Sequence, residues 1–162
     1  MNKLDYLAKK GRISAISDVD RNRYLNFFSK SYRENFEHCK FNLKKFPRWS
    51  IISGYYAMHD ITKLFLADKF RIKIDLKVHE TVIEVFRELI KDGEILKLLN
   101  FGYNEFLKLL NDLVEAKEKR TKVQYYTGTA FLKKEYLVQA REFFNEIVQP
   151  YLNKIRNLKD VN

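Results

Sequence analysis

The stretch IISGYYAMHDITKLFL, residues 51–66, decides the fold class of this chain. Its apolar side chains fall on nearly every side of a helical wheel, whereas a helix at a protein surface carries them on one face. Such a pattern is typical of a helix with neighbours on most sides. It predicts a central helix from about Trp49 to Phe70.

The composition favours further helices around this one. Five glycines and two prolines among 162 residues are too few turn formers for a many-stranded sandwich or barrel. Hydrophobic periodicity predicts helices at about 18–45, 49–70, 78–91, 104–125 and 133–149, with Pro47 ending the first and the last able to continue beyond Pro150. The predicted fold is all-α, an up-and-down bundle of four or five main helices over residues 18–162. Residues 1–17 are expected to form an N-terminal extension that could be loose.

The segment from Phe70 to Val78 departs from the helical pattern. Apolar and charged residues alternate strictly in RIKIDLK, residues 71–77, and this period of two is a strand signal. No convincing partner strand is evident in the sequence. We therefore expect a short extended connection between the second and third main helices, with a two-stranded ribbon as the less favoured form.

Several classes of protein and site are excluded by what the sequence lacks. No stretch approaches about 18 uncharged apolar residues, the first residues include no apolar leader segment, and Cys39 is the single cysteine. We therefore expect a cytoplasmic protein that neither spans a membrane nor contains an internal disulfide. The three histidines are scattered, and no Glu is followed three residues later by His, so no metal site is expected. Glycine-rich phosphate loops and nucleophile elbows are also missing, and no cofactor is expected.

The distribution of charge points to a polyanionic partner. The net charge is +10, with 17 basic and 8 acidic residues up to Lys77 but 14 and 13 after it. Because a merely solubilising surface would be charged evenly, this asymmetry favours a surface for nucleic acid or a nucleotide. If consecutive helices are antiparallel, one end of the bundle gathers Arg21, Arg23, Lys69, Arg71, Lys73, Lys77, Arg120, Lys122, Lys133 and Lys134.

Arg120 is the sharpest single candidate for a site. On a helical wheel it continues the apolar stripe of Phe106 and Leu113, so that a guanidinium follows apolar side chains on the same face. An unpaired buried charge is very costly. We therefore expect Arg120 to line a cleft or an interface, with His79 at the same end of the bundle and able to face it.

The expected ligand-binding residues surround this pair. Most aromatic side chains lie on apolar stripes and are predicted to be core, whereas Tyr125 and Tyr126 are predicted to be exposed and able to stack on a base. The whole expected set is Arg120, Lys122, Gln124, Tyr125, Tyr126, His79, Lys77 and Lys73.

Three motifs of the chain resemble the HEPN family (higher eukaryotes and prokaryotes nucleotide-binding domains). Residues 53–58, SGYYAM, are similar to the Tyr-Tyr-Ala-Met signature of the family's core helix. His79 with Val82, Ile83 and Phe86 is similar to its next helix. Arg120 with Gln124 and Tyr125 looks like its Arg-x-x-x-Asp-Tyr segment, and the resemblance covers about residues 20–152.

The resemblance implies a small helical bundle, usually a homodimer, with an RNA or nucleotide site in the dimer cleft. Many relatives pair with a minimal nucleotidyltransferase as a toxin–antitoxin system, and the active ones are metal-independent endoribonucleases that use Arg followed by four to six residues and His. This chain has Tyr125 five residues after Arg120 and no His beyond His79. Without that imidazole the usual general acid or base is missing.

Three functions therefore remain open at this point. The favoured one is a module that binds RNA or a nucleotide. The second is an endoribonuclease in which His79 is the acid or base and Arg120 stabilises charge on the scissile phosphate. The third is a subunit or antitoxin that interacts only with a partner protein.

Overall fold

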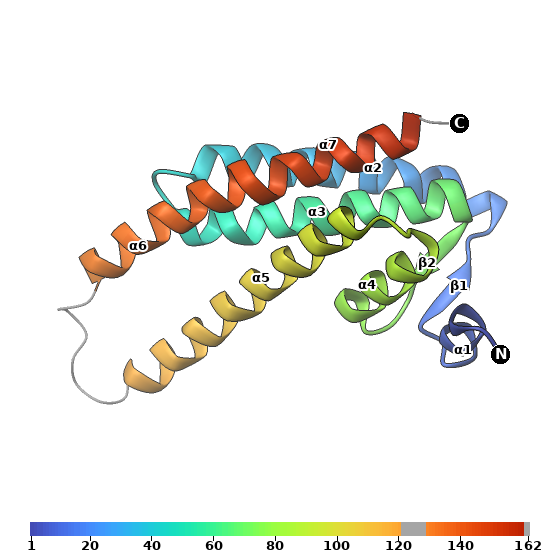
Figure 1. Ribbon diagram of the computed structural model, residues 1–162, viewed down its shortest axis with the longest axis horizontal. Helices are drawn as coiled ribbons and strands as arrows, with labels where there is room; N and C mark the ends of the chain where they lie inside the picture. The colour runs from blue at the N-terminus through green and yellow to red at the C-terminus, as the bar shows by residue number, and fades with distance from the viewer. Residues whose placement is uncertain (121–128, 161–162) are drawn as a thin grey trace.

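As predicted, the chain folds as an all-α helical bundle (Figure 1). Among the residues described it also contains one small two-stranded ribbon. The computed structural model describes the backbone of residues 1–120 and 129–160, and the side chains of residues 1–111 and 134–160. Its elements are α1 (Lys3–Lys9), β1 (Ile13–Ala15), α2 (Asp18–Asn42), α3 (Pro47–Phe70), β2 (Ile72–Ile74), α4 (Val78–Leu89), α5 (Gly93–Arg120), α6 (Thr129–Glu142), a π-helical segment η1 (Phe143–Val148) and α7 (Gln149–Asp160).

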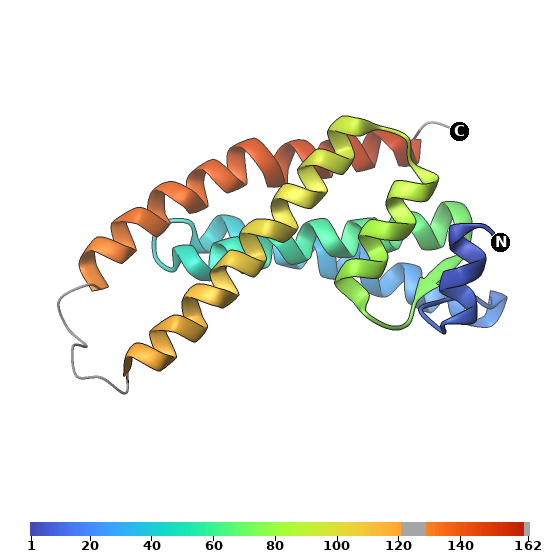
Figure 2. The ribbon, with the colours of Figure 1, turned by 60° about the horizontal axis from the view of Figure 1, so that its bottom comes forward.

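Helix α3 is the centre of the bundle, as the apolar stretch predicts. Sixteen of its 24 residues are buried, because α2, α5 and the continuous α6–η1–α7 rod all pack against it (Figure 2). Helix α2 runs antiparallel to α3, since Cys39 contacts Ser50 and Arg21 contacts Asp68. The C-terminal rod runs parallel to α3, and the hydroxyl groups of Thr62 and Tyr151 lie 2.6 Å apart in the core.

Helix α4 runs parallel to α3, against the expectation that consecutive helices alternate in direction. The ring of His79 lies beside Tyr55, with centroids 5.5 Å apart, and the ring of Phe86 lies beside Phe65 at 6.0 Å. Residue numbers therefore increase in the same direction along both helices. The extended segment after α3 causes this, because it carries the chain back to the middle of α3 before α4 begins (Figure 1).

The ribbon that was the less favoured prediction is present. Strand β2 pairs antiparallel with β1, with Ile13 opposite Ile74 and Ala15 opposite Ile72. The partner strand escaped the sequence analysis because it has only three residues and lies within the predicted N-terminal extension.

Residues 3–16 are packed rather than loose, which corrects the prediction for the N-terminus. Leu7 has no exposed surface, and Ile13 and Ile16 are 7% and 4% exposed. The guanidinium of Arg12 donates hydrogen bonds to Thr81 Oγ1 at 2.9 Å and Glu84 Oε1 at 2.8 Å. This segment therefore packs on α4 and, through β1, pairs with β2.

Three helix boundaries also differ from prediction. Helix α2 ends at Asn42, and Pro47 begins α3 rather than ending α2, because proline suits the first helical position. Asp92 caps the start of α5 through its Oδ1, which accepts from the amides of Glu94 and Ile95. That cap lets α5 begin at Gly93, about eleven residues before the predicted start. The last helix continues through Pro150, as allowed for.

Two glycines differ in the space available for a side chain where helices pack on α3. A Cβ on Gly54 would lie 2.9 Å from Val148 Cγ2 and 3.0 Å from Cys39 Sγ, whereas one on Gly102 would meet only the end of the Met58 side chain as its close contact. Overpacking costs about 1–3 kcal/mol, and alanine regains up to about 1 kcal/mol of helix propensity. We expect Gly54→Ala to lower the free energy of unfolding, measured in urea, and Gly102→Ala to leave it nearly unchanged because methionine adapts. Equal losses in the two variants would contradict this assignment.

Candidate functional site

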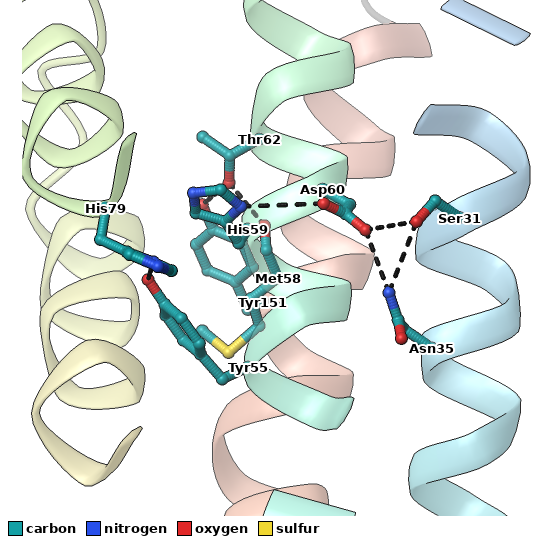
Figure 3. Close-up of polar contacts among 9 residues, drawn as sticks. All are labelled: Ser31, Asn35, Tyr55, Met58, His59, Asp60, Thr62, His79 and Tyr151. Atoms are coloured by element: carbon teal, nitrogen blue, oxygen red, sulfur yellow. Dashed lines mark hydrogen bonds and ion pairs between the residues drawn. The ribbon is translucent and has the colours of Figure 1, made fainter. Parts of the chain in front are cut away.

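His79, the predicted acid or base, lies in the first turn of α4 within an aromatic cluster (Figure 3). Its Nδ1 is 2.8 Å from the hydroxyl of Tyr55, which is buried. Its ring is 4.9 Å from the ring of His59 and nearly parallel to that of Tyr103, with centroids 6.0 Å apart. His79 itself is half-buried.

His59 lies between this cluster and a buried carboxylate, and neither of its ring nitrogens has a hydrogen-bond partner among the described side chains. It is 2% exposed, and its Nδ1 lies 3.7 Å from Asp60 Oδ1. The other carboxylate oxygen of Asp60 accepts hydrogen bonds from Ser31 Oγ at 2.6 Å and Asn35 Nδ2 at 3.0 Å (Figure 3). The hydrogen bond between Tyr55 and His79 thus ties α3 to α4, and the bonds of Ser31 and Asn35 to Asp60 tie α2 to α3.

Burial controls the protonation of this cluster. Loss of solvation lowers the pKa of His59 and of His79, and each is lowered further by the charge of Lys63. Burial also lowers the pKa of Lys63, whose ammonium lies 4.8 Å from the centre of the Phe28 ring. Both imidazoles are therefore neutral at pH 7. A neutral His79 can accept a proton, but among the described side chains no arginine lies beside it to hold a phosphate.

The structure does not bring Arg120 to His79. His79 stacks against Tyr103 and packs on Phe106 of α5, whereas the backbone of Arg120 is the last of that helix, 14 residues further on. At 1.5 Å per residue the separation is about 21 Å along the helix axis. The expectation that the two residues face each other within one chain is therefore wrong, because the third main helix begins beside the middle of α3.

The remaining predicted ligand residues are dispersed. Lys122, Gln124, Tyr125 and Tyr126 lie outside the described residues. Lys77 is exposed and is the residue just before α4, in the left-handed conformation. Lys73 lines a cleft of about 380 Å³ at the junction of the ribbon and α2, together with Arg23 and Phe27.

The predicted basic end of the bundle is divided and largely neutralised. The start of α2 and the end of α3 lie at one end, and the end of α5 and the start of α6 lie at the other (Figures 1 and 2). At the first end four of the six predicted cations pair with carboxylates: the ion pairs are Arg21–Asp68, Arg23–Asp20, Arg71–Asp18 and Lys73–Asp75. Lys69 and Lys77 have no carboxylate partner within 4.0 Å among the described side chains.

A different surface combines exposed aromatic rings with cations that form no ion pair among the described side chains; one of them, Arg48, lies 5.7 Å from the centre of the Tyr136 ring. We call this surface the turn patch, and it consists of Phe41, Lys44, Lys45, Phe46, Arg48 and Trp49, all exposed around the connection between α2 and α3. Phe41 is 78%, Phe46 51% and Trp49 60% exposed. No acidic residue lies between Glu37 and Asp60 in the sequence.

The sequence analysis missed this surface because it assigned nearly all aromatic residues to the core. The signal was nevertheless local: in FNLKKFPRW, residues 41–49, three aromatic residues alternate with three cations around a proline. A helix ends and another begins there, and Phe41, Phe46 and Trp49 stay exposed although α6 reaches Arg48 through Tyr136.

A hydrogen-bond network holds the turn patch in place. Asn42 Nδ2 is 3.0 Å from His38 Nε2, and His38 Nδ1 bonds Ser53 Oγ, which in turn donates to the carbonyl of Trp49 at 2.8 Å. Ser50 Oγ donates to the carbonyl of Cys39 at 2.7 Å. The end of α2 and the start of α3 are thereby fixed to each other, and the patch is presented on a rigid support.

Comparisons of the chain with family models, curated proteins and solved structures found no match. Within the described part of the chain, no group of three or more His, Cys, Asp or Glu side chains could hold a metal ion. No helix of that part has both the length and the apolar character needed to cross a membrane.

Proposed function

We propose that this chain is a helical module of the HEPN type that binds single-stranded RNA through the turn patch. The observation that carries the proposal is the exposure of Phe41, Phe46 and Trp49 among cations in a segment without acidic residues. Exposed rings stack on bases, and lysine and arginine neutralise phosphates.

The local backbone supports the same ligand. Helix α3 begins at the turn patch with no acidic residue in its first turn and no side-chain cap. Its first amides and the positive end of its dipole therefore favour a nearby anion. Unpaired bases can reach flat aromatic side chains, whereas the bases of a duplex are already stacked on one another, so a single strand fits this surface better.

The wider HEPN assignment belongs to the same proposal. It rests on the Tyr-Tyr-Ala-Met stretch of α3 and the His79 segment of α4, which pack together in the core through Tyr55. On this assignment the module forms a homodimer and acts with a minimal nucleotidyltransferase in a toxin–antitoxin system. Co-purification of the chain with such an enzyme and its mass in solution test these two partners.

The RNA proposal can be tested with the chain's own fluorescence. Trp49 is the single tryptophan, so its emission reports directly on the turn patch. We expect a ten-residue oligouridylate to quench this emission, and a duplex of the same length to quench it less. With labelled RNA, Trp49→Ala should weaken binding about tenfold or more.

The basic residues give a second, independent readout. The triple variant Lys44→Ala/Lys45→Ala/Arg48→Ala should weaken binding and make the plot of log K against log salt shallower by about 2. The matched control is Lys9→Ala/Lys91→Ala/Lys97→Ala, which removes the same charge from exposed positions elsewhere. An equal effect of the two triples, or binding to anionic vesicles but not to RNA, would overturn the proposal.

The same mixtures test the ribonuclease alternative. We expect RNA to remain intact in excess EDTA, because His79 Nδ1 is engaged by the Tyr55 hydroxyl and no arginine lies beside the ring among the described side chains. Metal-independent cleavage that disappears in His79→Ala would favour the endoribonuclease instead. Binding by a partner protein, with no affinity for RNA near physiological salt, would favour the interaction-only alternative.

A further inference from the structure

Two arginines, one from α2 and one from α7, contact the same tyrosine of α2. Tyr32 is 6% exposed. The guanidinium of Arg33 lies 5.7 Å from the centre of its ring and that of Arg156 lies 5.6 Å from it. Arg33 Nε also donates to the Tyr32 hydroxyl at 3.4 Å.

These two positive charges lack a compensating carboxylate. Within residues 1–111 and 134–160, no Asp or Glu oxygen lies within 4.0 Å of either guanidinium. The neighbouring acids of α2 are already engaged, since Glu34 pairs with Lys30 and Glu37 with Lys40. Arg156 Nη1 donates to Asn153 Oδ1 at 3.4 Å, and its guanidinium also lies 6.0 Å from the centre of the Phe36 ring.

The nearby positive charge changes the pKa of Tyr32. Burial alone would raise the pKa of Tyr32, but hydrogen bonds from Arg33 and Arg156, together with their charges, bring it below its ordinary value. Both guanidiniums lie within 6 Å of the centre of one ring and neither has a carboxylate partner, so both attract an added anion beside Tyr32. The guanidinium fork is also the group best matched to phosphate oxygens.

We propose that Arg33, Arg156 and Tyr32 form a clamp for a phosphate group. The two guanidiniums donate to the phosphate oxygens, and the Tyr32 hydroxyl, held by Arg33, completes the donor set. The phosphate could come from RNA or from the free anion, and the chemistry of recognition is the same. The clamp shares no residue with the turn patch, so each proposal can fail without the other.

The experiment measures three ligands in a phosphate-free buffer of constant ionic strength: inorganic phosphate by titration calorimetry, and 5′-phosphorylated and 5′-hydroxyl oligouridylates by anisotropy. We expect Arg33→Gln and Arg156→Gln each to weaken phosphate binding about tenfold or more. Tyr32→Phe, which keeps the ring, should weaken it less. Circular dichroism melts check that each variant is folded.

The matched control is Arg87→Gln, which removes an exposed arginine on α4. Loss of affinity for the phosphorylated oligomer alone identifies a terminal phosphate, equal loss for both oligomers identifies the phosphodiester backbone, and loss confined to inorganic phosphate identifies the free anion. Absence of phosphate binding by the folded parent chain, or an equal effect of Arg87→Gln, rejects the clamp. In either case Trp49 quenching by RNA still reports on the turn patch separately.

Discussion

Replacing Leu7 by alanine is expected to lower the free energy of unfolding by about 2–5 kcal/mol. The side chain of Leu7 has no exposed surface and packs in the hydrophobic core cluster with residues of α3 and α4. Removing it leaves a cavity where α1 packs against α4 and β1, and such a cavity is costly because the surroundings relax only in part. An N-terminal extension that was loose would show no such effect.

Urea denaturation of the full chain measures this loss. The control is Val19→Ala, because Val19 is 91% exposed and its truncation should change the free energy of unfolding by less than about 0.5 kcal/mol. A Leu7→Ala variant as stable as the Val19 control would show that the N-terminal segment does not contribute to the core in solution.

Acid is expected to destabilise the fold between pH 6.5 and pH 5 because of the buried histidines. The pKa values of His59 and His79 are lowered in the folded chain, mainly by burial. Below the unfolded value of about 6.5 the unfolded chain takes up these protons first, so stability is fully present above that pH and is lost as the pH falls. The loss can reach about 1.4 kcal/mol per pH unit for each proton.

The charged groups near the two histidines determine how readily each ring is protonated. Asp60 favours the protonated form of His59, whereas Lys63 and the second imidazole oppose protonation of the pair. Acidic side chains contribute mainly at lower pH. Glu84, for example, is held below its ordinary pKa by the hydrogen bond from Lys3 and by Arg12. The window from pH 6.5 to pH 5 therefore reports on the histidines.

The test is the dependence of urea unfolding on pH in the parent chain and in His59→Gln/His79→Gln. The double variant should be less stable at pH 7 but should show a flatter dependence below pH 6.5. An unchanged slope in the double variant would assign the acid sensitivity to other groups. The single variants His59→Gln and His79→Gln then show how much of the pH dependence comes from the fully buried ring of His59 and how much from the half-buried ring of His79.

The candidate site could be predicted only in part. His79 was singled out correctly as a side chain on the inner face of its helix, because that placement follows from its spacing to Phe86. Its neighbours could not be predicted, since Tyr55 and His59 reach it only through the parallel packing of α4 on α3. The turn patch lies in contiguous sequence and could have been found from the alternation of cations and aromatic residues.

The sequence by itself determined the helical class, the central place of α3 and the extended nature of residues 72–74, because each depends on a periodicity within a few neighbouring residues. Tertiary structure alone decided the direction of α4, the partner of β2 and the pairing of Arg21 with Asp68. Those features depend on contacts between residues far apart in the chain. The short extended segment after α3 carries the chain back along about half the length of that helix, and this decides which helix ends lie together in the bundle. The periodicity of neighbouring residues does not determine such a path.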